Sequence, residues 1–285
     1  MDCKLSYVRG AIIGAGMALS DELAKCTFAS MSEEALTNKA KNILTQKLAN
    51  CSVVEDVCWD NDLFPFVKAS EDLPEGYTIY ARPIDNARNI LCGMSAGGIF
   101  GIYRTRGWTY ELVCSMYMIY GKNLTVVWAD KVDWQTTMRV YQGRKAGPEV
   151  TINRPVTGQT YTICADHHMV DPPIPTMVEV LSHYKYRPFN SGSIIQDTHN
   201  VLLNGGVLQC TENAVHQDGS PLARLSTRMP IALMACLSEP VLSNEQKKEL
   251  SADIVGSSGF GDACMLSILH DIENIYSAIN TENII

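Results

Sequence analysis

The sequence predicts an α/β (α+β) fold, built of layered helices and sheets in two subdomains. The chain has 285 residues, whereas an average domain has about 150. Short runs of β-type residues are grouped between segments with helical spacing, a pattern typical of helices packed on sheets. The pattern begins again after residue 158. We therefore expect an N-terminal subdomain at 1–158, with a large mixed or antiparallel sheet, and a C-terminal subdomain at 159–285.

Two helices are expected before the sheet. Residues 4–27 place apolar and small residues at helical spacing, despite three glycines. A second helix is expected at 32–49, where Ser32 is a good N-cap because its hydroxyl can accept a hydrogen bond from a free backbone N–H. Glu33 and Glu34 in the first turn complement the positive end of the helix dipole.

Short runs rich in β-branched and aromatic residues follow, and they predict one large sheet. The connections between them are brief, which favours antiparallel neighbours. A loop with two prolines and a glycine, at 62–76, separates the first run from the others. The expected strands are 51–57, 77–85, 97–104, 111–121, 124–129 and 137–143.

The second half alternates strands and helices. The helix expected at 193–206 is amphipathic and ends at a glycine pair, a common C-terminal stop. Pro230 is tolerated because it lies near the first turn of its helix. Strands are expected at 159–165, 207–212 and 252–259, and the other helices at 176–184, 229–238 and 261–279.

Composition and charge exclude several functional classes. Hydrophobic residues make up 46% of the chain and charged residues 19%, so the chain is not disordered. The net charge is −8 and no run of Lys or Arg exceeds two residues, which argues against a nucleic-acid partner. No apolar stretch is long enough to span a membrane. The ten cysteines are scattered without a CxxC pair, so we expect buried thiols, no zinc site and a cytoplasmic protein.

The segment RPIDNARNILCGMSAGGIFGIYR, at 82–104, is the most informative. It resembles the Asp-Pro-Leu-Asp-Gly-Ser-Ser-Asn-Ile run and the following Gly-Thr-Ile-Phe-Gly-Ile-Tyr-Arg strand of class 1 fructose-1,6-bisphosphatases. Further resemblances follow in the same order: GSIIQDTH at 192–199, GGVL at 205–208 and ADIVGSS at 252–258. Together they make the resemblance specific, although each short match is weak alone.

This resemblance implies a layered αβαβα sugar-phosphatase fold, a homotetramer, and Mg²⁺-dependent removal of the 1-phosphate of fructose 1,6-bisphosphate. Such hydrolysis needs divalent ions held by convergent carboxylates, so that an activated water attacks in line and the leaving oxygen is neutralised. The carboxylates that match the family's ligands therefore decide whether the chemistry persists.

Several departures from the family fall on that machinery. Arg82 replaces the first Asp of the motif, a metal ligand in the family, and a guanidinium repels a cation. The second Asp is retained as Asp85. The Gly-Ser-Ser that wraps the phosphate is replaced by Asn86, Ala87 and Arg88. Asp85 either ligates a metal or is a remnant that pairs with Arg82 or Arg88; Arg82, Asn86 and Arg88 are candidate anion ligands.

Other positions of the site are also changed. Glu55 and Asp56 match the family's adjacent glutamate pair, so Glu55, Asp56 and Asp85 are the candidate catalytic remnants, and Glu55 and Asp85 the candidate metal ligands. The alternative for Glu55 and Asp56 is a solvated strand end. Thr227 stands where the family has a further glutamate ligand. With ligands lost, we expect Mg²⁺ binding to be weak or absent.

The sugar pocket differs as well. His167 and His168 lie where the family has an Asn-Glu-Gly-Tyr run, and they are candidate substrate or anion ligands beside Asp166 and Asp171. The alternative is a polar loop, because adjacent residues on a strand point to opposite faces. Asp197 and His199 are two apart on a helix, so they should not face each other.

Three functions remain open from the sequence. The favoured one is a divergent fructose-1,6-bisphosphatase-like protein that lacks the Mg²⁺-dependent activity and serves as a binding, regulatory or oligomer-partner protein. A second is a repurposed enzyme that acts on a different small anionic metabolite in the same pocket. A third is a sugar-phosphate phosphatase that is still active. All three predict a sugar phosphate or another small anion as ligand, and a homo-oligomer by resemblance.

Overall fold

The structure is a computed structural model of the chain. The structure describes residues 3–27, 30–59, 76–106, 109–130, 135–153, 159–164, 181–183, 185–210 and 265–268.

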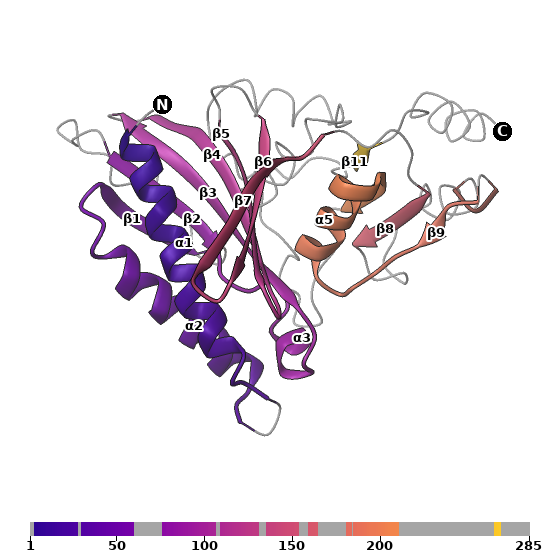
Figure 1. Ribbon diagram of the computed structural model, residues 1–285, viewed down its shortest axis with the longest axis horizontal. Coiled ribbons are helices and arrows are strands. Elements are labelled where there is room, and N and C mark those ends of the chain that lie inside the picture. Colours follow the sequence, from indigo (N-terminus) through magenta and orange to yellow (C-terminus); the bar gives the residue numbers. More distant parts are fainter. Residues whose placement is uncertain are drawn as a thin grey trace.

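Two helices pack side by side along one face of a large sheet (Figure 1). Helix α1 spans Cys3–Leu23 and helix α2 spans Glu33–Leu48, which confirms both N-terminal helices. The expected cap is also present, because the Ser32 Oγ accepts a hydrogen bond from the Ala35 N–H at 3.2 Å. The cap therefore satisfies one of the free backbone N–H groups in the first turn of α2.

The large sheet has seven strands in the order in which they occur along the chain. Strands β1 and β2 are parallel, and every later neighbouring pair is antiparallel, as expected for the segment after residue 77. The strands are β1 Val54–Trp59, β2 Gly76–Arg82, β3 Ala96–Arg106, β4 Thr109–Tyr120, β5 Leu124–Asp130, β6 Thr136–Gln142 and β7 Lys145–Thr151.

Strand β7 was not expected from the sequence. Its run, KAGPEVT, contains Gly147 and Pro148, which argue against a strand inside a sheet. The structure places β7 at the edge of the sheet, paired only with β6, and largely exposed. An edge strand tolerates proline because one row of its backbone groups needs no ladder partner.

A second, four-stranded sheet lies beyond helix α5. Helix α5 spans Ile194–Asn204 and ends at Gly205, in agreement with the amphipathic pattern. It lies between the two sheets, in contact with β3 and β4 on one side and with the smaller sheet on the other (Figure 1). The strand order is β11-β10-β8-β9, with β8 Thr160–Cys164, β9 Arg187–Pro188, β10 Gly206–Cys210 and β11 Met265–Ile268.

The strands of the large sheet carry two separate cores because successive side chains point to opposite faces. Phe100 and Met116 belong to the core under α1 and α2. Ile99 and Tyr117, their chain neighbours, belong to the core under α5, together with Ile195. The resulting layers are helices, large sheet, α5 and small sheet, which confirms a mixed and layered α/β fold.

One expected element is wrong. The closing helix predicted over 261–279 is contradicted at Met265–Ile268, which form strand β11, antiparallel to β10. A short apolar run such as Met-Leu-Ser-Ile suits either a helix or a buried strand, and here pairing with β10 decides. The helix expected at 176–184 is described only at 181–183, where it is helical.

Several other expectations fall outside the described residues, so they stay predictions. They are the loop at 62–75, the helix at 229–238 and the strand at 252–259. The division at 158 and 159 also stays a prediction, although the two sheets lie on either side of it in the sequence. In the described part of the chain, no helix combines the length and the apolar character needed to cross a membrane.

Gly10 tests the packing of α1. A Cβ atom added at Gly10 would have no heavy atom within 4 Å, and the residue is exposed. Because glycine costs about 1 kcal/mol relative to alanine inside a helix, Gly10→Ala should raise the free energy of unfolding by about that amount. Denaturant unfolding of the two proteins measures the difference, and a destabilised variant would contradict an open outer face on α1.

Candidate functional site

The candidate site lies where the C-terminal end of β2 meets the start of α5. After Arg82 the chain turns through residues 83–86 into α3, a short helix that spans Ala87–Leu91. It then returns as β3, which begins at Ala96 beside the start of α5. The neighbouring segments 82–89 and 95–98 and the distant segment 191–197 therefore form one cluster.

Asp85 is the centre of this cluster, and its side chain is buried. One carboxylate oxygen, Oδ1, accepts a hydrogen bond from the Gly97 N–H at 2.7 Å. The other, Oδ2, accepts from the Ser193 hydroxyl at 2.6 Å and from the Ile195 N–H at 2.9 Å. The Asp85 N–H in turn donates to the Gly97 carbonyl at 2.8 Å. Asp85 thus ties the turn after β2 to the start of β3 and to the N-terminus of α5.

The pKa of the Asp85 carboxyl depends on both its burial and its hydrogen-bond partners. Burial raises the pKa of the carboxyl above its ordinary value, and the three hydrogen bonds and the Arg82 charge oppose that rise. The N-terminus of α5 adds the positive end of a helix dipole, since Ser193 is the N-cap and Ile195 lies in the first turn. A carboxylate of the chain itself therefore occupies the helix terminus.

Two asparagines also connect the segments that meet at Asp85, which we call the Asp85 junction: the turn after β2, the start of β3 and the start of α5. Asn86 caps α3, because its Oδ1 accepts from the Asn89 N–H at 3.1 Å, and its Nδ2 donates to the Gly192 carbonyl at 2.6 Å. The Nδ2 of buried Asn89 donates to the carbonyls of Ser95 and Ser191. Asn86, a candidate anion ligand, therefore has both side-chain polar atoms bonded to the backbone.

The two arginines near Asp85 are placed differently from each other. The Arg82 Nη2 lies 3.5 Å from the backbone carbonyl oxygen of Asp85, while the carboxylate oxygens of Asp85 take the partners named above. Arg88 is exposed on α3. The Asp85 carboxylate accepts hydrogen bonds from Gly97, Ser193 and Ile195, and the Arg82 charge acts on it as well. The expected pairing with Arg88 stays a prediction.

Glu55 and Asp56 lie at the opposite end of β2 from Asp85. In the parallel pair, Asp56 is level with Thr78, and Trp59 is level with Ala81. Four residues of strand, about 13 Å, separate Thr78 from Arg82. The Glu55 Oε2 instead accepts a hydrogen bond from the Thr105 hydroxyl at 3.2 Å, and Asp56 accepts from its neighbouring Val57 N–H at 2.8 Å.

This placement does not fit the metal site that the resemblance implies. Ligands of one Mg²⁺ ion lie about 2.1 Å from it, so Glu55 and Asp85 cannot share an ion across the length of β2. Among the residues that the structure describes, no group of three His, Cys, Asp or Glu side chains is arranged to hold a metal. Matching Glu55 and Asp56 to the family's glutamate pair is therefore inconsistent with the strand register, which starts β1 at Val54 rather than at residue 51.

The histidines at 167 and 168, with Asp166 and Asp171, lie outside the described residues, as does Thr227. Their candidate roles stay predictions.

The sequence reasoning missed the partners of Asp85. Ser193 is the N-cap of α5 and is fully buried, and Gly97 receives the side chain of Ile195 where a Cβ would otherwise lie. A serine before an amphipathic run indicates an N-cap. The hydrogen bond from the Ser193 hydroxyl to Asp85, 108 residues away, had no sign in the sequence.

Asp197 and His199 point to different partners, as expected. The Asp197 Oδ1 accepts from the Ser191 N–H at 2.9 Å, and the His199 Nδ1 lies 2.9 Å from the Tyr117 hydroxyl. Burial, with a smaller contribution from Asp85, raises the pKa of Asp197 to about 6. Burial lowers the pKa of His199 to about 4.

These two groups should give opposite pH dependences of stability. Folded Asp197 holds its proton up to about pH 6, against 3.8 when unfolded, so its contribution to stability falls as the pH rises from 4 to 6. Folded His199 loses its proton near pH 4, against 6.5 when unfolded, so its contribution rises over nearly the same range. Each contribution is about 3 kcal/mol, and in the wild type they largely cancel.

Asp197→Asn should expose the His199 contribution, since an Asn Oδ1 can still accept from the Ser191 N–H. Relative to wild type, the variant's free energy of unfolding should rise by about 3 kcal/mol between pH 4 and pH 6.5. Urea unfolding of both proteins across this range measures the difference. Parallel pH profiles for the two proteins would contradict the assignment.

Comparisons with known proteins agree with the resemblance. The chain is 29% identical over 175 residues to a class 1 fructose-1,6-bisphosphatase of Helicobacter hepaticus, a match that covers 60% of this chain and 59% of the relative. It is 28% identical over 177 residues to a class 1 fructose-1,6-bisphosphatase of Acaryochloris marina, covering 55% and 53% of the two chains. The matches thus span less than two thirds of the length of these curated relatives. No family model matches the chain.

Solved structures show the same fold. The Leishmania major fructose-1,6-bisphosphatase in its holo form superimposes with a TM-score of 0.76 at 15% identity, over 98% of this chain and 94% of that one. The T-state structure of that enzyme gives the same TM-score and identity, over 99% and 94%. The chain is therefore similar in sequence to class 1 fructose-1,6-bisphosphatases, and it has the fold of the solved fructose-1,6-bisphosphatase structures.

Proposed function

We propose that the chain is a fructose-1,6-bisphosphatase-like protein without Mg²⁺-dependent sugar-bisphosphatase activity, and that it serves as a binding or regulatory protein for a sugar phosphate or a similar small anion. One observation carries this proposal: the Asp85 carboxylate, the retained acid of the family's motif, is used to join β3 and α5. Its two oxygens accept three hydrogen bonds, from the Gly97 N–H, the Ser193 hydroxyl and the Ile195 N–H, at 2.6–2.9 Å.

Electrostatics support the loss of metal chemistry. Mg²⁺ needs near-octahedral oxygen ligands, and a pair of carboxylates on one ion requires them to converge. Here Arg82 stands in place of the motif's first aspartate. Its guanidinium repels a cation, and it already helps to stabilise the Asp85 charge. Removing Asp85 from its three donors to ligate a metal would leave the Ser193 hydroxyl and the Gly97 and Ile195 N–H groups without partners.

The two arginines near Asp85 favour the binding of an anion over that of a metal ion. Arg82 is half-buried and Arg88 is exposed, at the two ends of the turn that replaces the family's phosphate loop. Arginine suits phosphate and carboxylate groups because its planar guanidinium donates two parallel hydrogen bonds. A sugar phosphate held by these side chains would be bound without an ion and without hydrolysis.

Two assays test this function. Phosphate release from fructose 1,6-bisphosphate is measured with and without Mg²⁺, and binding of the same compound is measured by calorimetry in the absence of metal. We expect no Mg²⁺-dependent release, and binding that weakens at least tenfold in Arg82→Ala and Arg88→Ala. Lys145→Ala, on the exposed edge strand β7, is the matched control and should bind as wild type does.

The other outcomes separate the alternatives. Robust Mg²⁺-dependent release that is lost in Asp85→Asn would show an active sugar phosphatase and refute the proposal. Turnover of a different anionic metabolite that requires Arg82 or Arg88 would assign a repurposed enzyme. If the folded protein binds no sugar phosphate, the proposed binding role is refuted.

A further inference from the structure

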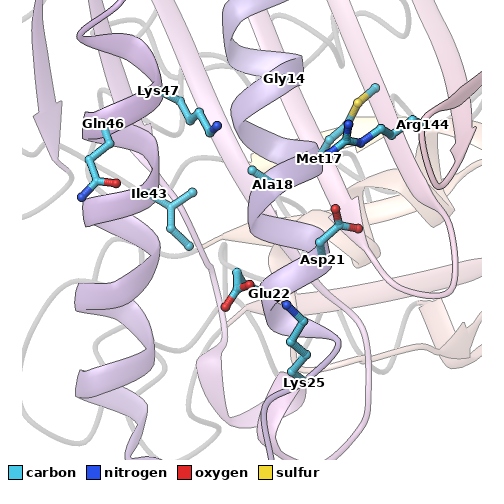
Figure 2. A pocket seen from close by; sticks show the side chains of 10 residues that line it. All are labelled: Gly14, Met17, Ala18, Asp21, Glu22, Lys25, Ile43, Gln46, Lys47 and Arg144. Atoms are coloured by element: carbon cyan, nitrogen blue, oxygen red, sulfur yellow. Dashed lines mark hydrogen bonds and ion pairs between the residues drawn. The ribbon is translucent and has the colours of Figure 1, made fainter.

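A hollow of about 540 Å³ lies on the helical side of the protein, away from Asp85. Figure 2 shows its walls: Lys47 reaches from α2 towards α1, and Arg144, in the turn between β6 and β7, reaches the other flank of α1. Helix α1 packs on the face of the large sheet opposite to α5, so this hollow and the Asp85 junction are separate. Its volume lies within the range of small-molecule sites, about 300–1,000 Å³.

The floor of the hollow is apolar, and small residues on α1 leave the helix backbone accessible there. Gly14 and Ala18 are one helical turn apart on α1, and Met17 and Ile43 complete the apolar lining. A Cβ atom added at Gly14 would have no heavy atom within 4 Å, so the missing side chain leaves open space above the helix backbone. A flat apolar group can therefore approach the α1 backbone closely at this position.

The charges around the hollow favour an anion. Three basic and two acidic side chains line it, although the whole chain carries a net charge of −8. Glu22 is held by Lys25 at 2.6 Å and by Lys39 at 2.8 Å, and these partners lower the pKa of Glu22 to about 2. Within the described ranges, neither Lys47 nor Arg144 has an ion-pair partner, so both cations are available to a ligand.

We propose that this hollow binds a small organic anion with a flat apolar body, whose acid group is held by Lys47 or Arg144 on the rim. The apolar body would cover Gly14, Ala18 and Met17, and burial of that surface supplies the non-polar part of the affinity. The acid group gains charge-assisted hydrogen bonds. An inorganic anion would use only the rim. A cation would meet Lys47 and Arg144, with only Asp21 to attract it, because Glu22 is already paired with two lysines. This site is independent of the function proposed for the Asp85 region.

The dye 8-anilinonaphthalene-1-sulfonate is a suitable probe, since it joins an apolar aromatic body to one sulfonate. Its fluorescence is titrated with the full chain, with Gly14→Leu and Gly10→Leu as a matched pair. Both glycines are exposed on α1 and have open space around a Cβ, but only Gly14 lines the hollow. Leucine also raises helix propensity at both positions, so neither variant should fail to fold.

Charge is tested separately. Lys47→Glu and Arg144→Glu remove the rim cations, and Lys122→Glu, in the exposed turn between β4 and β5, makes the same charge change away from the hollow. We expect saturable binding that weakens at least tenfold in Gly14→Leu and about threefold or more in each rim variant. Gly10→Leu and Lys122→Glu should stay within twofold of wild type.

Three results would overturn the proposal. One is dye binding that is absent, or that is equal in Gly14→Leu and Gly10→Leu. Another is displacement of the dye from the rim by inorganic phosphate with no effect of Gly14→Leu, which would show a site for an inorganic anion only. The third is a wild-type dimer, seen by sedimentation, that Gly14→Leu dissociates, because a second copy of the chain would then cover the hollow.

Discussion

Replacing Asp85 by alanine is expected to lower the free energy of unfolding by about 3–5 kcal/mol. The residue is 7% exposed, and removal of its carboxylate leaves three buried donors without an acceptor: the Ser193 hydroxyl and the N–H groups of Gly97 and Ile195. Each unsatisfied buried donor costs about 1–3 kcal/mol, and relief of the buried charge offsets part of the sum. Urea unfolding monitored by circular dichroism measures the change.

Asp56→Ala is the matched control for this substitution. Asp56 is also an aspartate of the large-sheet region, within β1, but it is exposed, and its hydrogen bonds are to the neighbouring Val57 and Cys58. Its replacement should change the free energy of unfolding by no more than about 0.5 kcal/mol. Equal effects of the two substitutions, or an Asp85→Ala protein as stable as wild type, would show that Asp85 does not hold the junction.

Replacing Gly97 by alanine is expected to cost about 2–4 kcal/mol, the second large effect. A Cβ at this position would lie 2.2 Å from the Ile195 Cβ, on the side of β3 that packs against α5. The backbone has little room to move, because the Gly97 N–H and carbonyl are both bonded to Asp85, at 2.7 and 2.8 Å. The clash must therefore push α5 away from the sheet.

A double-mutant cycle with Ile195→Ala tests this cause. The smaller side chain at 195 gives space to the new methyl group at 97, so the cost of Gly97→Ala should be at least 1 kcal/mol less in the Ile195→Ala background. Additive effects of the two substitutions would locate the damage elsewhere. Gly10→Ala, on the open face of α1, is the control for a glycine-to-alanine change without a steric neighbour.

Local signals in the sequence predicted most of the described elements. The cap at Ser32 and the amphipathic run before Gly205 are features of a few adjacent residues, and both helices form where expected. The runs of β-branched and aromatic residues in β3 to β6 are also local features, and they need no distant information. Strand β7 was not predicted because Gly147 and Pro148 are unfavourable in a strand, except at the edge of a sheet. Strand β11 was predicted as a helix because its four apolar-rich residues fit a helix or a strand equally.

The site depended on information that adjacent residues do not carry. Asp85 could be recognised as a retained acid, but its bond to Ser193 joins residues 108 positions apart, and a single sequence does not show that pairing. Glu55 and Asp56 were misplaced for a related reason. Strand register decides which residues are level across a sheet, and β1 is set so that Trp59, not Asp56, lies level with the end of β2.

The most direct measurement of the central claim is a calorimetric titration of the wild-type protein and Asp85→Asn with Mg²⁺ and Mn²⁺. If Asp85 is a junction between β3 and α5, neither ion should give a saturable heat with wild type at millimolar concentration. The metals should also leave the thermal midpoint of both proteins unchanged, because no ligand set stabilises the folded state. Saturable metal binding by the wild type that disappears in Asp85→Asn would contradict the account and return Asp85 to the role of a metal ligand.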